Sequence, residues 1–462
     1  MCVLSTNPWL NKMPKFQIFH LGEKKMKFSK FFYVVVLLAM VLAACTPAQP
    51  ATEAPAAEAP AATEAPAATE APAATEAPAA EAPAAAGEPE VCTTDAYGCA
   101  VIPSGTTIKI GMGGPMIGDY SMFGIDISQG TMVALSEHEG LNGSAYELVA
   151  LDTGGAPEAG AAVANKLVTD PTVVAIAGHI FSGETDAAMP IYEKAGLPML
   201  SPSATNPPLT QQGNKSFNRI AFTDATQAKY AADMLFTDMG FTKIATIHDG
   251  STYGKGLADE VAKVFTELGG EVVASEAINP GEADYSSTLS AIASKGPEAV
   301  YFGGYAAEAI VMVNQWNQAG LTGVQFFGCD GTYGVEFTDK TGPNGEGAIA
   351  VSLVPPDSPE KTAFDTKYKE MFGLEAGELS PFTWSAYDVG SALVYAIESV
   401  AVVSDDGNTY IPRGALMDAV RGLKDFTGLT GLISCDEVGE CNASGPTFYS
   451  VQDGKWAPYS AE

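Results

Sequence analysis

Apolar residues occur along this chain in short runs that alternate with longer amphipathic stretches. The short runs are typical of buried β-strands, and the longer ones place Ala159, Val163 and Leu167 on one helix face. Strands are predicted at 107–111, 146–151, 173–178, 198–201, 244–248, 271–275, 299–303 and 325–328, and helices at 158–168, 256–268, 285–293, 306–319 and 362–372. This alternation predicts an α/β protein with parallel sheets that are covered by helices on both faces.

The part of the chain with this pattern begins near residue 91 and is too long for one ordinary core. Residues 91–462 are 372 residues, whereas a single hydrophobic core stops growing at about 250–300 residues. The length therefore indicates two lobes.

The pattern before residue 91 is different. A short basic segment precedes an apolar run at 31–41 that ends in Leu-Ala-Ala-Cys45. A basic head, an apolar run shorter than the roughly 20 residues of a membrane span and small residues at a cleavage site are typical of a secretory signal. The ending resembles a bacterial lipobox, whose cysteine is diacylated and becomes the first mature residue. We expect a signal peptide at 26–44 and a lipidated Cys45. The alternative is a membrane helix with a buried cysteine. Residues 1–25 are expected to be an upstream extension of the reading frame.

Residues 46–90 repeat Ala-Pro-Ala-Ala-Thr-Glu almost without variation and contain no apolar side chain larger than Ala. Such a segment cannot form a core, so residues 45–90 are predicted to be an extended, acidic tether to the outer face of the cell membrane. Six of the 24 Lys and Arg residues and one of the 55 Asp and Glu residues precede Cys45, so the remaining chain has a net charge of −36. This charge makes nucleic acid and polyanionic substrates poor partners, and beyond the lipid anchor it disfavours anionic lipid surfaces.

Four cysteines form two close pairs. Cys92 and Cys99 lie in a lead-in segment, 91–104, and Cys435 and Cys441 lie near the end of the chain. Close pairs in an exported chain predict two local disulfides. The alternative is a four-cysteine zinc site, which usually has two to four residues between paired ligands.

The loops that follow the predicted strands are rich in small hydroxyl residues, glycine and aromatic residues. Ser182 lies in the loop after strand 173–178, and Ser203 and Thr205 follow strand 198–201. Hydroxyl and backbone N–H groups near a helix start suit a carboxylate, and the isolated acid Asp330 suits an ammonium. Since ligands of open parallel sheets bind beyond the carboxyl ends of the strands, these loops are predicted to form a binding site.

Several stretches resemble the solute-binding proteins of branched-chain amino acid ABC transporters, in order from about residue 105 to the end. They are Gly178-His179, 201–207, Ile247-His248-Asp249 with Tyr253-Gly254, 301–305, 277–281, 284–286 and Asp436-Glu437. The resemblance implies a two-lobe type I periplasmic-binding fold with three hinge crossings. It implies one lobe from 105–223 and 352–434, a second lobe from 224–351 and 435–462, and delivery of a solute to ABC permease subunits.

The resemblance also implies the roles of individual residues. Ser182 and Thr205 would hold the α-carboxylate of an amino acid, while the Ser203 carbonyl and the Thr205 hydroxyl would accept from its ammonium, with Asp330 as counter-charge. The residues expected to close on the solute or surround its side chain are Tyr253, Tyr305, Phe123, Phe181, Phe382 and Trp384. Phe123 replaces a tyrosine that is frequent in the family, Phe181 replaces a disulfide cysteine of some relatives, and Asp330 is shorter than the glutamate of others.

An enzyme is the main alternative class. The chain has four histidines, at 20, 138, 179 and 248, and no pair has metal-ligand spacing. Ser182 lacks the Gly-x-Ser-x-Gly elbow of a hydrolase, and residues 111–116 have Met where a dinucleotide loop needs its third glycine. We therefore expect a monomeric binding protein that is not an enzyme and uses no cofactor or metal. A binding protein for a short amide, urea-like solute or aromatic or other organic acid, and a sensor subunit that presents its ligand to a separate receptor, stay open.

Overall fold

The computed structural model describes residues 88–441 and 445–460. The predicted upstream extension, signal peptide, Cys45 lipidation and tether therefore lie outside the described residues. Among the residues that are described, no helix is long and apolar enough to cross a membrane.

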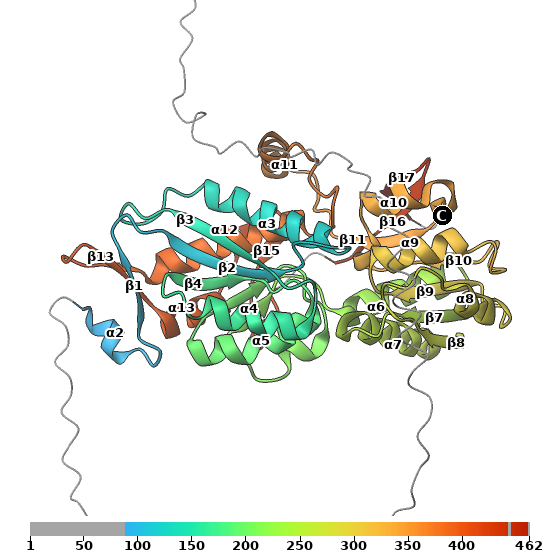
Figure 1. Ribbon diagram of the computed structural model, residues 1–462, viewed down its shortest axis with the longest axis horizontal. Coiled ribbons are helices and arrows are strands. Elements are labelled where there is room, and N and C mark those ends of the chain that lie inside the picture. Colours follow the sequence, from blue (N-terminus) through green and yellow to red (C-terminus); the bar gives the residue numbers. More distant parts are fainter. Residues whose placement is uncertain (1–87, 442–444, 461–462) are drawn as a thin grey trace, which may run out of the picture. The chain divides into compact units, whose positions relative to one another are not determined.

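One sheet has five parallel strands in the order β3-β2-β4-β5-β6, of which β2, β3 and β4 are labelled in Figure 1. These strands are β2 (Ile108–Gly114), β3 (Tyr146–Asp152), β4 (Val173–Ala177), β5 (Met199–Ser201) and β6 (Phe217–Arg219), and the helices between them are α3 (Ser121–Ser136), α4 (Pro157–Leu167) and α5 (Ser182–Ala195). Every residue of β4 is buried, as expected for a parallel strand with helices on both faces of its sheet.

The other large sheet has seven strands in the order β17-β16-β11-β10-β9-β7-β8. Five of them are parallel: β7 (Lys243–His248), β8 (Glu271–Ala277), β9 (Ala299–Gly303), β10 (Gln325–Phe327) and β11 (Ile349–Ser352). The hairpin β16 (Thr447–Gln452) and β17 (Lys455–Pro458) adds two antiparallel strands. The helices of this lobe are α6 (Asp224–Asp233), which continues as a π-helix at Met234–Asp238, α7 (Thr252–Glu267), α8 (Ser286–Ala293), α9 (Ala306–Gln315) and α10 (Val335–Thr341).

Helix α7 shows how the sequence pattern produces this packing. The Ser251 hydroxyl caps its start by accepting from the Gly254 N–H, which satisfies one of the free amides of the first turn. Leu257, Val261 and Phe265 then recur every four residues and are fully buried. The apolar stripe therefore faces the sheet, as its spacing predicts.

The chain passes between the two sheets three times: after β6, after β11, and between Cys441 and β16. The second passage leads into α11 (Pro359–Phe372) and α12 (Thr383–Val400), and α12 packs on α3, whose Thr131 hydroxyl donates to the Ala386 carbonyl. The remaining elements are α2 (Glu90–Thr94), β1 (Cys99–Pro103), β12 (Val402–Val403), β13 (Asn408–Pro412), α13 (Arg413–Arg421), β14 (Phe426–Gly428) and β15 (Gly431–Ile433). The predicted α/β fold with two lobes and three crossings is confirmed.

Residues 439–441, which the resemblance assigns to the second lobe, pair with strand β6 of the first sheet. The Arg219 N–H donates to the Gly439 carbonyl, and the Cys441 N–H donates to the Arg219 carbonyl, both at 2.9 Å. The physical reason is that β6 is an edge strand of the first sheet, so its free backbone groups can pair with this loop. The rest of the predicted division between lobes stays a prediction.

Both predicted disulfides are present, Cys92–Cys99 and Cys435–Cys441. Cys329 is a buried free cysteine, and its thiol donates to the Gly304 carbonyl at 3.1 Å. The four paired cysteines therefore do not form the alternative zinc site.

Candidate functional site

A small cavity lies where loops from the two sheets meet. The cavity is lined by Phe123, Ile180, Phe181, Ser182, Ser203, Tyr253, Tyr305, Asp330, Gly331 and Phe382. Its free volume is about 10 Å³, close to what one water molecule requires. Eight of the ten predicted ligand residues line it, which brings together loops that follow β4, β5, β7, β9 and β10.

One wall of the cavity carries hydroxyl groups at the start of helix α5. Ser182 is the first residue of this helix, and its hydroxyl accepts from the Asn206 N–H at 3.2 Å. The Ser203 hydroxyl donates to the Ile180 carbonyl at 2.9 Å. Both serines are buried. Since a helix N-terminus carries partial positive charge and unpaired amides, this wall suits a carboxylate.

The opposite wall carries a buried acid. Asp330 is 1% exposed, and its carboxylate accepts from the Tyr253 hydroxyl and, at 2.9 Å, from the side-chain amide of Gln227. Burial raises the pKa of Asp330, while the hydrogen bonds from Tyr253 and Gln227 lower it. Both donors are neutral, so neither supplies the positive charge that a buried carboxylate favours.

A second buried acid, which sequence reasoning missed, lies close to Asp330. Asp224 is fully buried, and neither of its carboxyl oxygens forms a hydrogen bond of ordinary geometry with the described residues, although the side chains of Thr205 and Asn206 lie close enough to lower its pKa. Burial, and then the nearby negative charge of Asp330, raise the pKa of Asp224 to about 8. Of the two buried acids, Asp330 is the one that lines the cavity.

Thr205 lies next to Asp224 and does not line the cavity. Its carbonyl accepts from the Asp224 N–H at 2.9 Å, and its buried hydroxyl forms no hydrogen bond of ordinary geometry with the described residues, although it lies close enough to Asp224 to lower the pKa of that acid. Unpaired buried oxygens are costly and usually mark a place where a ligand or water belongs. The signal for Asp224 in the sequence was weak, since Thr223-Asp224 is an ordinary helix start.

Aromatic rings from both lobes fill the space between the two polar walls. Phe181 and Tyr305 stack with ring centroids 4.3 Å apart. Phe123 lies edge-on to both of them, at 5.5 and 5.8 Å, and is 6.4 Å from Phe382. Tyr253 lies 5.4 Å from Tyr305. These rings leave almost no free space in this state.

The two lobes also bond directly across the site. The Tyr120 hydroxyl donates to Glu308 at 3.1 Å, and the Asn206 side-chain amide donates to the Thr252 carbonyl at 3.1 Å. Tyr120 and Asn206 come from the first lobe, and Thr252 and Glu308 come from the second. The lobes are therefore closed over the cavity.

Trp384 does not line the cavity. It packs with Val133, Phe364 and Tyr368, and its indole N–H donates to Asp365 at 2.8 Å. Phe382 precedes α12 and Trp384 lies two residues further on. Two helical residues span about 200°, so the two rings point to opposite sides of the helix.

The described part of the chain holds no group of three or more His, Cys, Asp or Glu residues that could bind a metal ion. The cavity itself offers the hydroxyls of Ser182 and Ser203, the buried acid Asp330 and aromatic rings. This combination is suited to holding a small molecule with a carboxylate and a positive group.

Comparison with known proteins agrees with the fold. Residues 107–453 match the periplasmic binding protein family. The chain is 30% identical over 357 residues to Leu/Ile/Val-binding protein homolog 1 of Brucella suis biovar 1 (strain 1330), covering 76% of this chain and 92% of that protein. It is 31% identical over 342 residues to the leucine-, isoleucine-, valine-, threonine- and alanine-binding protein of Pseudomonas aeruginosa, covering 72% and 87%.

Solved structures give the same result. A leucine-binding protein from Thermotoga maritima has a TM-score of 0.70 at 30% identity, covering 77% of this chain and 98% of that chain. A branched-chain amino acid transporter substrate-binding protein from Streptococcus pneumoniae, in complex with isoleucine, has a TM-score of 0.68 at 28% identity, covering 76% and 98%. The chain therefore belongs to the periplasmic binding protein family. It has the two-lobe type I fold, and it is an extracytoplasmic binding protein.

Proposed function

We propose that this protein is the solute-binding component of an ABC importer, and that it captures an amino acid with a branched or other hydrophobic side chain between its lobes and delivers it to the permease. The observation that carries the proposal is the cavity itself, with hydroxyls at a helix start on one wall and, on the other, a buried acid that accepts from two neutral donors. The names of the relatives support the same class of solute.

In this proposal the two polar walls hold the two charges of the amino acid. Ser182 and Thr205 bind the α-carboxylate. The Ser203 carbonyl and the Thr205 hydroxyl accept from the ammonium, and Asp330 supplies its counter-charge. The positions of Ser182, Ser203 and Asp330 in the cavity lining support these roles.

The aromatic rings surround the side chain of the solute. Tyr253 and Tyr305 close from the second lobe, and Phe123, Phe181 and Phe382 provide the apolar wall. Since the free volume is about 10 Å³, a solute enters only when the lobes separate. The lobes then close around it by the hinge motion expected of a periplasmic binding protein.

A thermal-shift screen across the common amino acids, short amides and aromatic acids tests the proposal. A solute at 100 times its dissociation constant stabilises the protein by about 2.7 kcal/mol. We expect leucine, isoleucine or valine to raise the melting temperature, and calorimetry then gives the dissociation constant. No shift with any hydrophobic amino acid would contradict the proposed solute.

A small aromatic acid is a second candidate, because five of the residues that line the cavity are aromatic. Such a solute has a carboxylate but no ammonium. Its binding would not need the charge of Asp330, so binding that survives Asp330→Asn favours this candidate.

We also propose that Cys45 carries a lipid that holds the protein at the outer face of the cell membrane, as a monomer that meets its permease there. The lipobox-like sequence before Cys45 and the repetitive segment after it support this proposal. Fractionation of cells that express the protein tests it.

A further inference from the structure

The loop that presents Ser203 and Thr205 rests on a buried arginine. Arg219 is the last residue of β6 and is fully buried. Its guanidinium donates from Nη1 to the Ala204 carbonyl at 3.0 Å and to the Asn206 carbonyl at 2.7 Å. Ala204 follows Ser203 and Asn206 follows Thr205, so the two hydrogen bonds from Arg219 hold the backbone of residues 203–206, which carries both hydroxyl residues.

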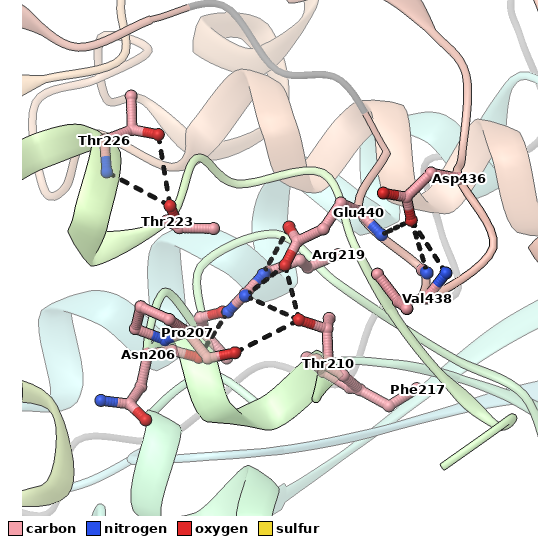
Figure 2. A network of polar contacts seen from close by, with 12 residues as sticks. Asn206, Pro207, Thr210, Phe217, Arg219, Thr223, Thr226, Asp436, Val438 and Glu440 are labelled. Carbon is pink, nitrogen blue, oxygen red and sulfur yellow. Dashed lines mark hydrogen bonds and ion pairs between the residues drawn. The ribbon is translucent and has the colours of Figure 1, made fainter. Parts of the chain in front are cut away.

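The same guanidinium is held from its other side by Glu440 (Figure 2). Nε donates to one carboxylate oxygen at 2.9 Å and Nη2 donates to the other at 2.5 Å. The Thr210 hydroxyl donates to Glu440 at 2.6 Å and accepts from Arg219 at 3.2 Å. A two-pronged contact of this kind fixes the plane of the guanidinium as well as its position.

Glu440 lies in a small loop that is closed by the Cys435–Cys441 disulfide. Inside the loop, the Asp436 carboxylate accepts from the N–H groups of Val438, Gly439 and Glu440 at 2.9–3.0 Å, as Figure 2 also shows. Backbone bonds tie the loop to both sides of Arg219. The disulfide and Asp436 therefore give Glu440 a fixed place beside the guanidinium.

The ion pair of Arg219 and Glu440 also lies next to two of the segments through which the chain passes from the first lobe to the second. After Arg219 the chain passes through 220–223 into α6, and after Cys441 it passes to β16 of the second sheet. The Arg219 side chain thus connects the loop at 203–206 to both of these crossings.

We propose that Glu440 and its disulfide-closed loop position the solute-binding loop through Arg219, and so set the affinity of the site although they touch no solute. The proposal rests on the proposed solute-binding role of Ser203 and Thr205. Without this carboxylate, the buried guanidinium loses the acid that is hydrogen-bonded to it and has to reach water or another acceptor. The carbonyls of Ala204 and Asn206 then lose their fixed donor.

Two pairs of variants test this inference with L-leucine as the solute. Glu440→Gln keeps the size of the side chain and removes its charge, and Glu437→Gln makes the same charge change at an exposed position of the same loop. Cys435→Ser with Cys441→Ser opens the loop, and Cys92→Ser with Cys99→Ser opens the other disulfide, whose sequence separation is 7 rather than 6. Rings of similar size constrain the unfolded chain similarly, so the two double variants are matched for the loss of this constraint.

We expect the Glu440 variant and the Cys435/Cys441 variant to bind L-leucine at least tenfold more weakly than the parent, and both controls to bind within twofold of it. Hydrogen exchange at the amides of residues 203–206 should be faster in the first two variants only, and this measurement needs no solute. If all four variants bind and exchange like the parent, the positioning role is wrong. If the parent binds no amino acid but exchange in the loop still responds to Glu440→Gln, the proposed solute is wrong and the support of the loop stands.

Discussion

Replacing Asp330 by asparagine should separate the charge of the site from its shape. Asparagine has nearly the same size as aspartate and can still accept from Tyr253 and Gln227 through its carbonyl oxygen. What is lost is the negative charge, which in the parent has two neutral donors and no cationic partner among the groups that bond to it. The variant should therefore fold normally, and its unliganded form should be at least as stable as the parent.

The size of the effect on binding follows from burial. Asp330 is 1% exposed, so an ammonium that meets it is almost fully removed from water. Breaking a buried ion pair by removing one partner costs about 3–5 kcal/mol. Since each 1.4 kcal/mol is about tenfold in affinity, the lower end of this range corresponds to a loss of about a hundredfold. We take the lower end because the amide still offers one oxygen.

Isothermal titration calorimetry with L-leucine measures this loss directly. Asp388→Asn is the matched control, because Asp388 is also a fully buried carboxyl but bonds to the backbone N–H groups of Leu429 and Thr430 and to the Thr430 hydroxyl, away from the cavity. The control should lower the melting temperature and leave the dissociation constant unchanged. Binding of L-leucine to Asp330→Asn within threefold of the parent would show that the ammonium is not held there.

The remaining predictions concern Asp224, Phe123 and Cys45. The pKa of Asp224 is raised from 3.8 to about 8, so between these two pH values the folded protein keeps this proton and the unfolded chain loses it. The contribution of Asp224 to the free energy of unfolding is therefore complete below pH 3.8 and is lost as the pH rises to about 8. The loss is up to ~1.4 kcal/mol per pH unit. Urea unfolding between pH 4.5 and 8.5 should show a flatter profile for Asp224→Asn, and parallel profiles would refute the assignment. Phe123→Tyr should change which hydrophobic amino acid binds best while affinity for the preferred one changes by less than about tenfold, as expected for one hydroxyl in a pocket; a general loss of binding would place Phe123 nearer the charged end. Cys45→Ser should move the protein from the membrane pellet to the soluble fraction with an unchanged melting temperature, and a variant that stays in the pellet would favour an uncleaved helix.

The residues of the cavity could be predicted from sequence because most of them follow the ends of predicted strands. Parallel strands bring their carboxyl ends to one edge, so Ser182, Ser203, Tyr253, Tyr305 and Asp330 had to converge once the alternation of strands and helices was recognised. The resemblance to a known family then supplied the pairing of the two lobes.

Other parts of the site carried no local signal. Asp224 and Gln227 are one turn apart on a helix that begins with an ordinary cap, so only the burial of that turn against Asp330 distinguishes them. Glu440 is separated by 221 residues from its partner Arg219, and no periodic pattern connects the two. The resemblance alone assigned Trp384 to the solute, and in the structure its ring packs with Val133, Phe364 and Tyr368.

The aromatic rings explain how a site with so little free space could still be selective. In the closed state Phe181 stacks on Tyr305, and Phe123 packs against both rings, so a solute has to replace contacts that the rings make with each other. An aromatic pair contributes about 0.5–1.5 kcal/mol beyond its buried area. A purely apolar solute recovers similar contacts and little more, because it makes no bond to either polar wall. A zwitterionic solute of the same size adds charge-assisted bonds at both walls, each about twice as strong as a neutral one. The contacts between the rings thus increase the binding free energy that a solute must supply, and in the proposed function only a solute with both charges supplies it.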